Sequence, residues 1–340
     1  MSNKLLTITI PVYNTEEYLP KCLDSLIIDE YMDLLEVLIV IDGSPDNSLA
    51  IAQNYAQKYP ETFIVINKEN GGHSSAINKG LELATGKYFK LLDSDDWFDK
   101  KSFKIFLEKL EKLDVDLLLT NYTREFVFEN RTELCSIKSL PHNKLYNIEQ
   151  IDESFLSDDS LLEMHRTTFK TSFFKDLEII LPEKVFYTDT ILAIVPLLLV
   201  KNVYYCNINL YCYFIGREGQ STSMEKFLKN RKQLEIVLKY TYEKVLKYKK
   251  STHTILLKCI LSKLRGLFAF YYTILSRLDY QQSKLELKEW NSFLKSTKYY
   301  SFFKYKNPII KIYDLLPFFI FWNMMLFYRK IEFKMQNYKK

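Results

Sequence analysis

The sequence lacks both of the common glycine-rich motifs that bind phosphate groups. Its 8 glycines form neither the GxGxxG fingerprint of dinucleotide-binding folds nor the GxxxxGK[ST] loop of nucleoside triphosphatases. Both motifs hold phosphates on backbone amides at the start of a helix. A nucleotide bound by this chain must therefore be held in another way.

Cysteine is also scarce, and its pattern excludes the usual cysteine-based sites. The five cysteines contain no Cys-x-x-Cys pair, and their number is odd. No basic segment precedes the apolar run near the N-terminus, so we expect no secretory leader. These features predict a reduced, cytoplasmic location.

Acidic residues are scarce in the last third of the chain. Residues 1–225 contain 22 Lys+Arg against 35 Asp+Glu, whereas residues 226–340 contain 25 against 7. The net charge of +5 conceals this asymmetry. An acidic first part and a basic second part predict separate tasks, the second facing something anionic. A chain of 340 residues can also bury a large core and hold more than one folding unit.

Short apolar, β-rich segments alternate with helical segments along the first 100 residues. Strands are expected at 5–10, 35–41, 63–66 and 87–92, and helices at 15–26 (capped by Thr15), 48–58 and 75–84. No hairpin signal interrupts the alternation. The pattern predicts an α/β fold with a mainly parallel central sheet and helices on both faces.

Three aspartates follow the fourth predicted strand within four positions. Asp93, Asp95 and Asp96 would lie at the carboxyl end of a parallel strand, where such sheets bind ligands. Like charges this close oppose one another's ionisation, and a bound Mg²⁺ or Mn²⁺ removes that cost while holding substrate phosphates. The alternative is a solvated acidic turn that caps the next helix.

Four segments at four predicted strand ends, taken in order, resemble the motifs of family 2 glycosyltransferases of the GT-A fold. They are Ile10-Pro11-Val12-Tyr13-Asn14, Val40-Ile41-Asp42-Gly43-Ser44, Asn70-Gly71-Gly72 with Asn78-Lys79-Gly80, and Leu92-Asp93-Ser94-Asp95-Asp96-Trp97. The similarity covers about the first 220 residues. It implies a Rossmann-like GT-A domain that transfers a sugar, with inversion, from a nucleotide-sugar, usually UDP-linked. The acceptor would be a hydroxyl of a glycan or lipid-linked saccharide in bacterial cell-surface polysaccharide synthesis.

The resemblance also implies roles for single residues around the donor. Asp95, together with Asp93, would hold Mn²⁺ or Mg²⁺ in a DxD motif, and Asp42 would accept a hydrogen bond from the nucleotide base. Asp93 would also lie toward the ribose. The residues expected to bind the donor are Pro11, Val12, Tyr13, Asn14, Asp42, Asn70, Gly71, Asp93, Ser94, Arg217 and Ser221.

The catalytic base is expected at Asp189. Family members often carry a carboxylate pair at this point, and here Thr188 replaces its first member. Inversion by one displacement needs one base opposite the leaving group. The alternative is that Asp189 only caps an apolar helix expected at 191–200. The preceding His165-Arg166 either lines the donor sugar or is a surface pair.

Residues 211–222 resemble the family's closing loop, in which an arginine and a Ser or Thr approach the pyrophosphate. Arg217 would supply a bidentate donor for phosphate oxygens, and the glycines at 216 and 219 would let the loop move as a lid. The alternative is a plain connector.

One position departs from the family pattern. Ile77 stands where many relatives carry an arginine that helps to hold the donor. Lys79 or Lys68 could replace that arginine, or the donor could be held differently. His73, in the same loop, is either a donor contact or incidental.

The C-terminal part has a different pattern. Residues 225–249, 254–278 and 285–293 have helical periodicity with many lysines. Residues 309–328 are apolar and aromatic with basic flanks, but Lys311, Asp314, Pro317 and Asn323 interrupt them below the ~20 residues that span a bilayer. This composition predicts an interfacial helix on an anionic membrane. The alternatives are packing on the catalytic domain and a contact between copies in a homo-oligomer.

The sequence thus predicts a GT-A catalytic domain at 1–224 and a basic, membrane-associating helical appendage at 225–340. Within the first, residues 1–100 would bind the nucleotide-sugar and residues 101–224 would supply the acceptor region and base. The enzyme would be peripheral at the inner face of the membrane, and no nucleic-acid-binding motif accompanies the basic residues. A donor-binding scaffold with a degenerate site is one alternative. A nucleotidyltransferase is another, although its lysine-containing phosphate loop is absent.

Overall fold

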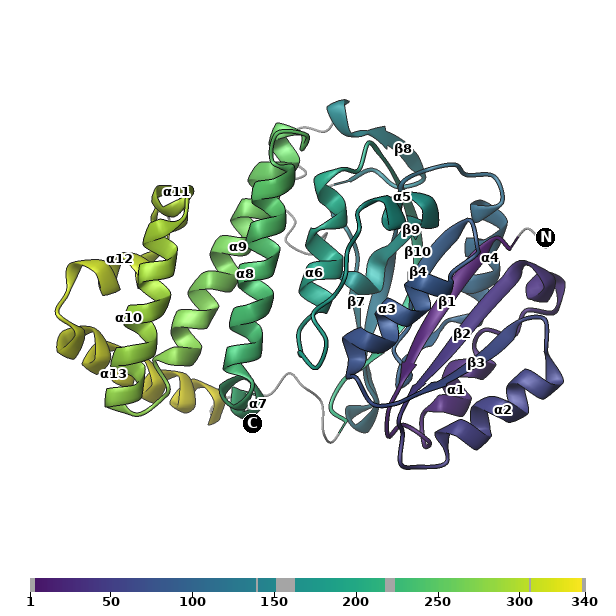
Figure 1. Cartoon of the computed structure of the whole chain (residues 1–340), viewed down its shortest axis with the longest axis horizontal. Coiled ribbons are helices and arrows are strands. Elements are labelled where there is room, and N and C mark those ends of the chain that lie inside the picture. Colours follow the sequence, from purple (N-terminus) through teal and green to yellow (C-terminus); the bar gives the residue numbers. More distant parts are fainter. Residues whose placement is uncertain (1–3, 139, 151–162, 218–223, 306, 338–340) are drawn as a thin grey trace. The chain divides into compact units, whose positions relative to one another are not determined.

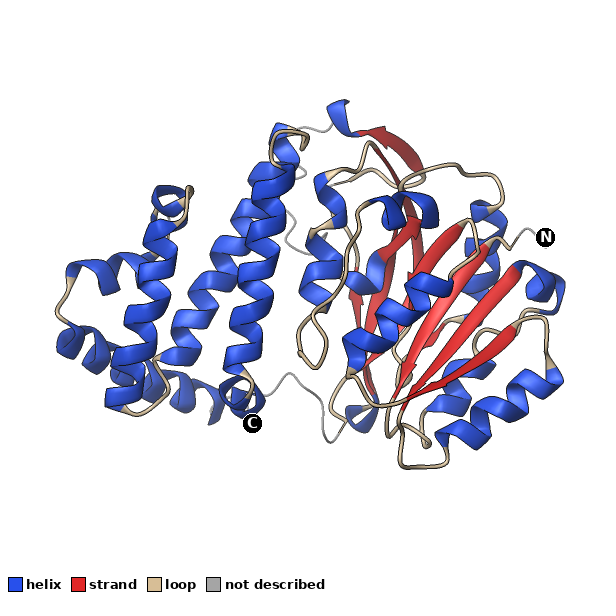
Figure 2. Ribbon diagram, viewed as in Figure 1, coloured by secondary structure: helices blue, strands red, loops and turns tan. Residues whose placement is uncertain are grey.

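The computed structural model describes residues 4–138, 140–150, 163–217, 224–305 and 307–337. The chain forms two compact units, one of Met1–Gln220 with Glu243–Leu257 and the other of Ser221–Tyr242 with Lys258–Lys340. The first unit is built on a β-sheet and the second is helical, as Figures 1 and 2 show.

A 10-stranded sheet forms the centre of the first unit. Its strands are β1 (Leu6–Val12), β2 (Leu35–Asp42), β3 (Phe63–Lys68), β4 (Tyr88–Leu91), β5 (Trp97–Phe98), β6 (Leu117–Phe126), β7 (Arg131–Cys135), β8 (Lys144–Asn147), β9 (Thr167–Lys170) and β10 (Asn202–Phe214).

The strand order is β3-β2-β1-β4-β9-β6-β10-β5, with β7 on β6 and β8 on β10. The four strands from β3 to β4 are parallel, as the alternation of strands and helices predicts. The sheet then becomes mixed: β9 runs antiparallel to both β4 and β6, while β6 and β10 are parallel. The predicted α/β fold, with a sheet between helices and parallel strands β1 to β4, is confirmed. A hairpin of β6 and β7 follows the segment that has no hairpin signal.

Helices flank the sheet on both faces (Figure 2) and form the second unit. They are α1 (Leu19–Asp24), α2 (Ser48–Lys58), α3 (His73–Leu83), α4 (Lys100–Leu110), α5 (Thr171–Asp176), α6 (Asp189–Ile194), α7 (Met224–Lys229), α8 (Arg231–Tyr248), α9 (Thr254–Leu275), α10 (Tyr280–Ser296), α11 (Tyr300–Lys304), α12 (Pro308–Leu315) and α13 (Phe318–Asn337).

The central strands form where the sequence is continuously apolar. Every residue of β1 and β2 is buried, as expected for strands covered on both faces. Helix α3 packs closely on β1 at Gly80, because a Cβ there would lie 2.2 Å from Cγ2 of Thr9. The sheet is therefore a rigid frame whose strand ends can hold a site.

Two helix starts differ from the prediction. Thr15 does not cap α1: its carbonyl accepts hydrogen bonds in a turn from the amides of Tyr18 and Leu19, and the helix begins at Leu19. The acidic turn at 93–96 does not cap the next helix either. Asp99 does so, because its side chain accepts a hydrogen bond of 2.9 Å from the amide of Ser102 in α4.

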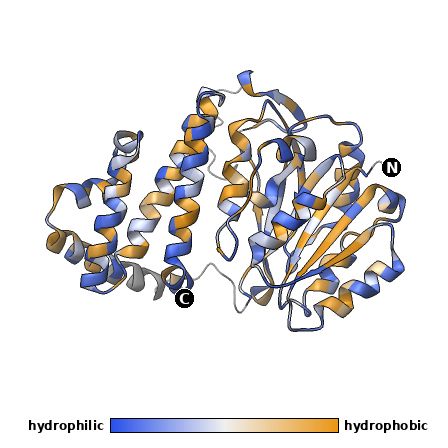
Figure 3. Cartoon of the chain, viewed as in Figure 1, coloured by the Kyte–Doolittle hydropathy of each residue, from blue (hydrophilic) through white to orange (hydrophobic). Residues whose placement is uncertain are grey.

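Aromatic side chains form the core of the helical unit. Trp290 of α10 is 1% exposed and lies edge-on to Phe268 and Tyr271 of α9, with ring centroids 5.3 and 4.7 Å away. An ion pair ties α8 to α10, since Arg231 donates to Glu286 at 2.8 Å from Nη2 and 3.0 Å from Nε. The hydropathy colouring of Figure 3 shows apolar residues along these helices.

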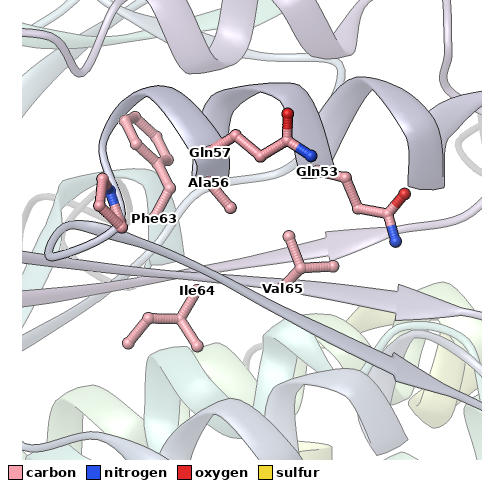
Figure 4. A pocket seen from close by; sticks show the side chains of 7 residues that line it. Gln53, Ala56, Gln57, Phe63, Ile64 and Val65 are labelled. Atoms are coloured by element: carbon pink, nitrogen blue, oxygen red, sulfur yellow. The ribbon is translucent and has the colours of Figure 1, made fainter.

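A surface hollow lies at the free edge of the sheet, between α2 and β3 (Figure 4). Its lining contains no titratable side chain and consists of Gln53, Ala56, Gln57, Pro60, Phe63, Ile64 and Val65. These residues come from α2, β3 and the turn between them, so the hollow does not include the strand ends that carry the carboxylates.

Candidate active site

The loop after β4 carries the three aspartates, and the structure divides them into two kinds. Asp96 is 1% exposed and accepts hydrogen bonds from the Tyr211 hydroxyl at 2.6 Å and the Phe214 amide at 2.8 Å. Burial, followed by the charges of Asp95 and Asp93, raises the pKa of Asp96 well above its ordinary value. Asp96 therefore fastens the loop to β10, and Asp93 and Asp95 remain partly accessible.

Each of the two accessible aspartates has a cationic or ionisable neighbour. His73 Nε2, at the first residue of α3, lies 3.0 Å from Asp93 Oδ1, and Arg217 Nε donates to Asp95 Oδ2 at 2.7 Å. Burial raises the pKa of Asp95, and the charge of Asp93 raises it further, although Arg217 opposes both. Burial acts in the same direction on Asp93, but the His73 hydrogen bond brings its pKa below the ordinary value. Asp95 thus carries an electrostatic cost that a cation would relieve.

Asp42, at the end of β2, organises the loop before α3. Its carboxylate is 2% exposed and accepts hydrogen bonds from Lys68 Nζ at 2.6 Å and from the amides of Gly71 and Gly72 at 2.9 and 2.7 Å. Gly72 has φ +86°, a conformation that favours glycine. Asn70 completes the turn by donating to the Asp42 carbonyl at 2.8 Å. Asp42 therefore supports the loop that carries His73.

Residues 181–185 are clasped to the same loop and to α3. The Asn78 side chain pairs with both backbone groups of Leu181, at 2.9 Å each. Ser74 donates to the Val185 carbonyl at 3.1 Å, and the Lys184 amide donates to the Gly71 carbonyl at 2.9 Å. We call these contacts the α3 clasp. They tie the segment before Asp189 to the loop that ends in His73.

Asp189 is the first residue of α6, directly after a strained stretch of backbone. Tyr187 has φ +69°, which is rare for a bulky side chain and is typical of functional sites. The cap residue is Thr188, without a side-chain cap bond, so the interpretation of Asp189 as a helix cap is wrong. The prediction of one helix over 191–200 is also wrong, because α6 ends at Ile194 and a 3₁₀ turn follows at Pro196–Leu198.

The electrostatics place Asp189 among the other charged groups. Burial of the carboxyl raises the pKa of Asp189, although the residue as a whole is exposed, and the charges of His165 and His73 oppose that rise. In turn, burial acts to lower the pKa of His73, but Asp93, Asp189 and Asp95 together raise it above the ordinary value. Asp189, His73 and Asp93 therefore affect one another's ionisation, although they come from different segments.

His165 lies in an aromatic stack beside this group. Its ring is stacked between Tyr213 and Tyr122, with centroids 4.4 and 5.1 Å away, and its side chain is 12% exposed. Arg166 is fully buried, with its guanidinium carbon 4.8 Å from the Tyr122 ring centroid. The interpretation of His165-Arg166 as a surface pair is therefore wrong.

A buried lysine holds the His165 turn in place. Lys90, in the middle of β4, is 1% exposed and donates to the carbonyls of His165 and Thr167, each at 3.1 Å. Burial lowers the pKa of Lys90 to about 7. Nothing in the periodicity analysis marks this residue, although a lysine inside a strand that is otherwise buried is a detectable signal.

Comparison with known proteins decides the family. The model of the family "Glycosyl transferase family 2" matches residues 7–171. A glycosyltransferase of Mycoplasma genitalium, MG025, is 33% identical over 234 residues, which cover 65% of this chain and 72% of that protein. The chain belongs to glycosyl transferase family 2.

Other relatives resemble this chain over part of their length. The minor teichoic acid biosynthesis protein GgaB of Bacillus subtilis is 32% identical over 151 residues, 41% of this chain and 17% of GgaB. The matches cover 38% of the putative glycosyltransferase EpsH of Bacillus subtilis and 31% of the glycosyltransferase GlyA of Streptococcus pneumoniae. This chain therefore spans well under half of the length of these proteins.

Solved structures support the fold. Crystal structures of residues 1–349 of S. aureus TarS, in complex with UDP and with UDP-GlcNAc, match with TM-scores of 0.68 and 0.66. The identities are 17% and 18%, and the matches cover 96% of this chain and 91% and 92% of the TarS chains. At this identity the likeness concerns the fold alone.

The remaining residues that the sequence predicts to bind a donor lie around the same strand ends. Pro11 and Val12 are buried at the end of β1, Tyr13 is 53% exposed, and Asn14 has φ +54° with its amide donating to Ser44 Oγ at 2.8 Å. Ser94 is buried and accepts a hydrogen bond of 2.9 Å from Thr15. Ser221 lies outside the described residues.

The position that lacks the family arginine points into the protein. Ile77 is 1% exposed in α3, so its side chain belongs to the core. Lys79 pairs with Glu82 of the same helix at 3.0 Å, and Lys68 pairs with Asp42 at 2.6 Å. Among the described residues, Arg217 contacts Asp95 directly and His73 contacts Asp93.

The donor set fits a divalent cation that is shared with a substrate. Among the described residues no three His, Cys, Asp or Glu side chains form a complete metal site. Asp93 and Asp95 nevertheless offer hard oxygen ligands two positions apart, and Mg²⁺ and similar ions are often bound by one or two carboxylates together with substrate phosphates. The raised pKa of Asp95 agrees with such a use.

Proposed function

We propose that this glycosyltransferase moves a sugar, with inversion, from a UDP-sugar to a hydroxyl of a glycan or lipid-linked acceptor in cell-surface polysaccharide synthesis. The observation that carries the proposal is a set of contacts: His73 lies 3.0 Å from Asp93, Arg217 lies 2.7 Å from Asp95, and the α3 clasp ties the segment before Asp189 to the loop that ends in His73. Two carboxylates that can hold a metal–diphosphate thus lie near a third, exposed carboxylate that can accept a proton. The UDP complexes of TarS and the teichoic acid role of GgaB support the donor and the pathway.

In this proposal the residues divide the reaction between them. Asp189, with its raised pKa, takes the proton from the acceptor hydroxyl as that oxygen attacks the anomeric carbon. Asp95 and Asp93 would hold Mn²⁺ or Mg²⁺, whose chemistry is to neutralise the diphosphate as it leaves. Arg217 adds a second positive charge at the same carboxylate and can hydrogen-bond phosphate oxygens. The strand ends from Pro11 to Asn14 and the Asp42–Gly71 turn would hold the nucleoside.

The test compares two isosteric variants in two assays. Asp95→Asn and Asp189→Asn should each reduce sugar transfer by about 10²-fold or more, the scale of a lost acid–base or charge-stabilising group. Only Asp95→Asn should weaken Mn²⁺-dependent UDP binding, measured by calorimetry. Glu108→Gln, an exposed carboxylate on α4, is the matched control. Near-normal transfer by Asp189→Asn would overturn its assignment as the base.

A second candidate is a donor-binding protein without transferase activity, favoured by the buried Ile77 in place of the family arginine. It would bind UDP-sugars with Mn²⁺ in a thermal-shift screen of UDP-, GDP- and dTDP-sugars. It would neither transfer nor hydrolyse them. Turnover in the same samples excludes this candidate.

We further propose that the enzyme is peripheral at the inner face of the cell membrane. Among the described residues, no helix is both long enough and apolar enough to traverse a bilayer. The supporting features are the basic composition of residues 226–340 and the aromatic segment 309–328.

A further inference from the structure

Helix α13 has an exposed apolar face that runs along two turns and more. Its members, spaced at helical intervals and lining one surface hollow, are Phe319, Ile320, Asn323, Met324, Phe327 and Tyr328. Phe319 and Phe327 are 65% and 67% exposed. The side-chain amide of Asn323 donates one hydrogen bond of 2.8 Å to the Phe319 carbonyl within the helix. We call this set the α13 outer face.

The opposite face of α13 is packed within the helical unit. Phe321 is fully buried and lies edge-on to Tyr313 of α12 at 5.0 Å, and Trp322 lies edge-on to Tyr280 of α10 at 5.8 Å. Arg329 also lies over the Trp322 ring, at 4.9 Å. A helix that is apolar all round is normally buried on every side. The helical unit covers the inner face of α13 and leaves the outer face exposed, and an exposed apolar patch of this kind is typical of an interaction surface.

The part of the sequence that carries this face is mostly basic. Asp314 is the only acidic residue between 308 and 329, and it is neutralised by Lys295 at 2.9 Å and by Lys304. The hydroxyl of Tyr300 also donates to it, at 2.5 Å. Lys311 is exposed on α12. With 25 basic against 7 acidic residues, the region 226–340 as a whole favours an anionic partner.

We propose that the α13 outer face inserts into the interfacial region of an anionic lipid bilayer, with α13 lying along the membrane surface. A bilayer of anionic lipid supplies both an apolar phase for Phe319, Met324 and Phe327 and negative charge that complements the basic region 226–340. This proposal names the face of the protein that meets the membrane, and its biological role rests on the proposed peripheral location. An acidic protein would supply negative charge without an apolar phase. A second copy of this basic chain would supply an apolar surface without negative charge.

The experiment measures co-sedimentation of the full chain with vesicles. The protein should pellet with phosphatidylglycerol/phosphatidylcholine vesicles and remain in the supernatant with pure phosphatidylcholine. The double variant Phe319→Ser/Phe327→Ser should lose at least tenfold in apparent affinity for the anionic vesicles. Leu285→Ser, which removes an equally exposed apolar side chain (59%) from α10, should bind like the parent chain. Rising salt should weaken the binding of the parent chain.

Three results would overturn the proposal. They are no pelleting by the parent chain, equal pelleting with neutral vesicles, and unchanged binding by the double variant. Gel filtration without lipid gives a fourth, because a dimer that the double variant converts to a monomer would make a second copy the occupant. Mn²⁺-dependent UDP binding should stay unchanged in the double variant, so a failed membrane assignment is distinguishable from a failed assignment of the active site.

Discussion

Arg217 Nε donates to Asp95 Oδ2 at 2.7 Å, across 122 residues of sequence. The guanidinium thus sits on the carboxylate that is expected to hold the metal. In this arrangement Arg217 partly offsets the charge that burial and Asp93 make costly for Asp95. Arg217 therefore marks where positive charge is needed.

Replacing Arg217 with alanine should weaken UDP binding in the presence of Mn²⁺ by about 10- to 100-fold, the range for lost hydrogen bonds to charged groups. Arg217→Lys should keep part of the affinity, because lysine retains the positive charge but cannot make the bidentate hydrogen bonds of a guanidinium. Isothermal titration with UDP measures both variants. Equal affinities for all three proteins would show that Arg217 is only a connector residue.

The pH dependence of turnover should report on Asp189. A general base must be ionised, so kcat should fall as the pH drops through its pKa, and that pKa lies above the ordinary value of about 3.9. Because His73 lowers the pKa of Asp189, His73→Gln should move the acidic limb of the kcat profile to higher pH. A limb that moves to lower pH in this variant, or a flat profile from pH 4 to 8, would contradict the assignment.

The α3 clasp should matter for chemistry more than for donor binding. Asn78→Ala removes both 2.9 Å hydrogen bonds to Leu181 and should loosen the segment that leads to Asp189. We expect kcat to fall about tenfold, since small displacements of a reacting group are costly, while the dissociation constant of UDP stays near that of the parent. Lys79→Ala, the next residue on α3, is the control. A loss confined to UDP affinity would place the effect of Asn78 in the donor site instead.

Lys90 should make stability depend on pH. Its pKa is about 7 in the folded state and above 10 when unfolded, so between these values the unfolded chain binds more protons. The unfolding free energy should therefore rise with pH across this window, with Lys90 contributing up to about 1.4 kcal/mol per pH unit. Lys90→Met should reduce that slope. Urea unfolding at pH 7, 8 and 9 measures it, and parallel slopes for the two proteins would refute the contribution.

Local chemistry made several elements predictable. The apolar runs of β1 and β2 and the polar turn after each led directly to the strands and their ends, and α2 spans Ser48–Lys58 as expected. Pro317, one of the predicted interruptions, separates α12 from α13. These features depend on neighbours in sequence, which a single chain displays.

Contacts between distant segments were not predictable in the same way. The His73–Asp93 pair, the Tyr211–Asp96 bond and the α3 clasp each join residues from different strands or loops, and periodicity carries no information about such pairs. Thr15 resembles a helix cap by type, but its hydroxyl is used by Ser94. The sequence also gives no sign of the positive φ of Tyr187, because a bulky aromatic residue rarely adopts that conformation.

Because Asp96 is buried, the motif contains two partly accessible carboxylates and one buried carboxylate that holds the loop to β10. Its two oxygens accept hydrogen bonds from Tyr211 and Phe214 of β10. In asparagine the amide oxygen could accept from the Phe214 N–H and the amide nitrogen could donate to the Tyr211 hydroxyl oxygen, which would hold the loop without a titratable carboxyl. An engineer who wishes to tune how strongly the loop attracts cations can therefore begin at position 96, where the ligands themselves stay untouched.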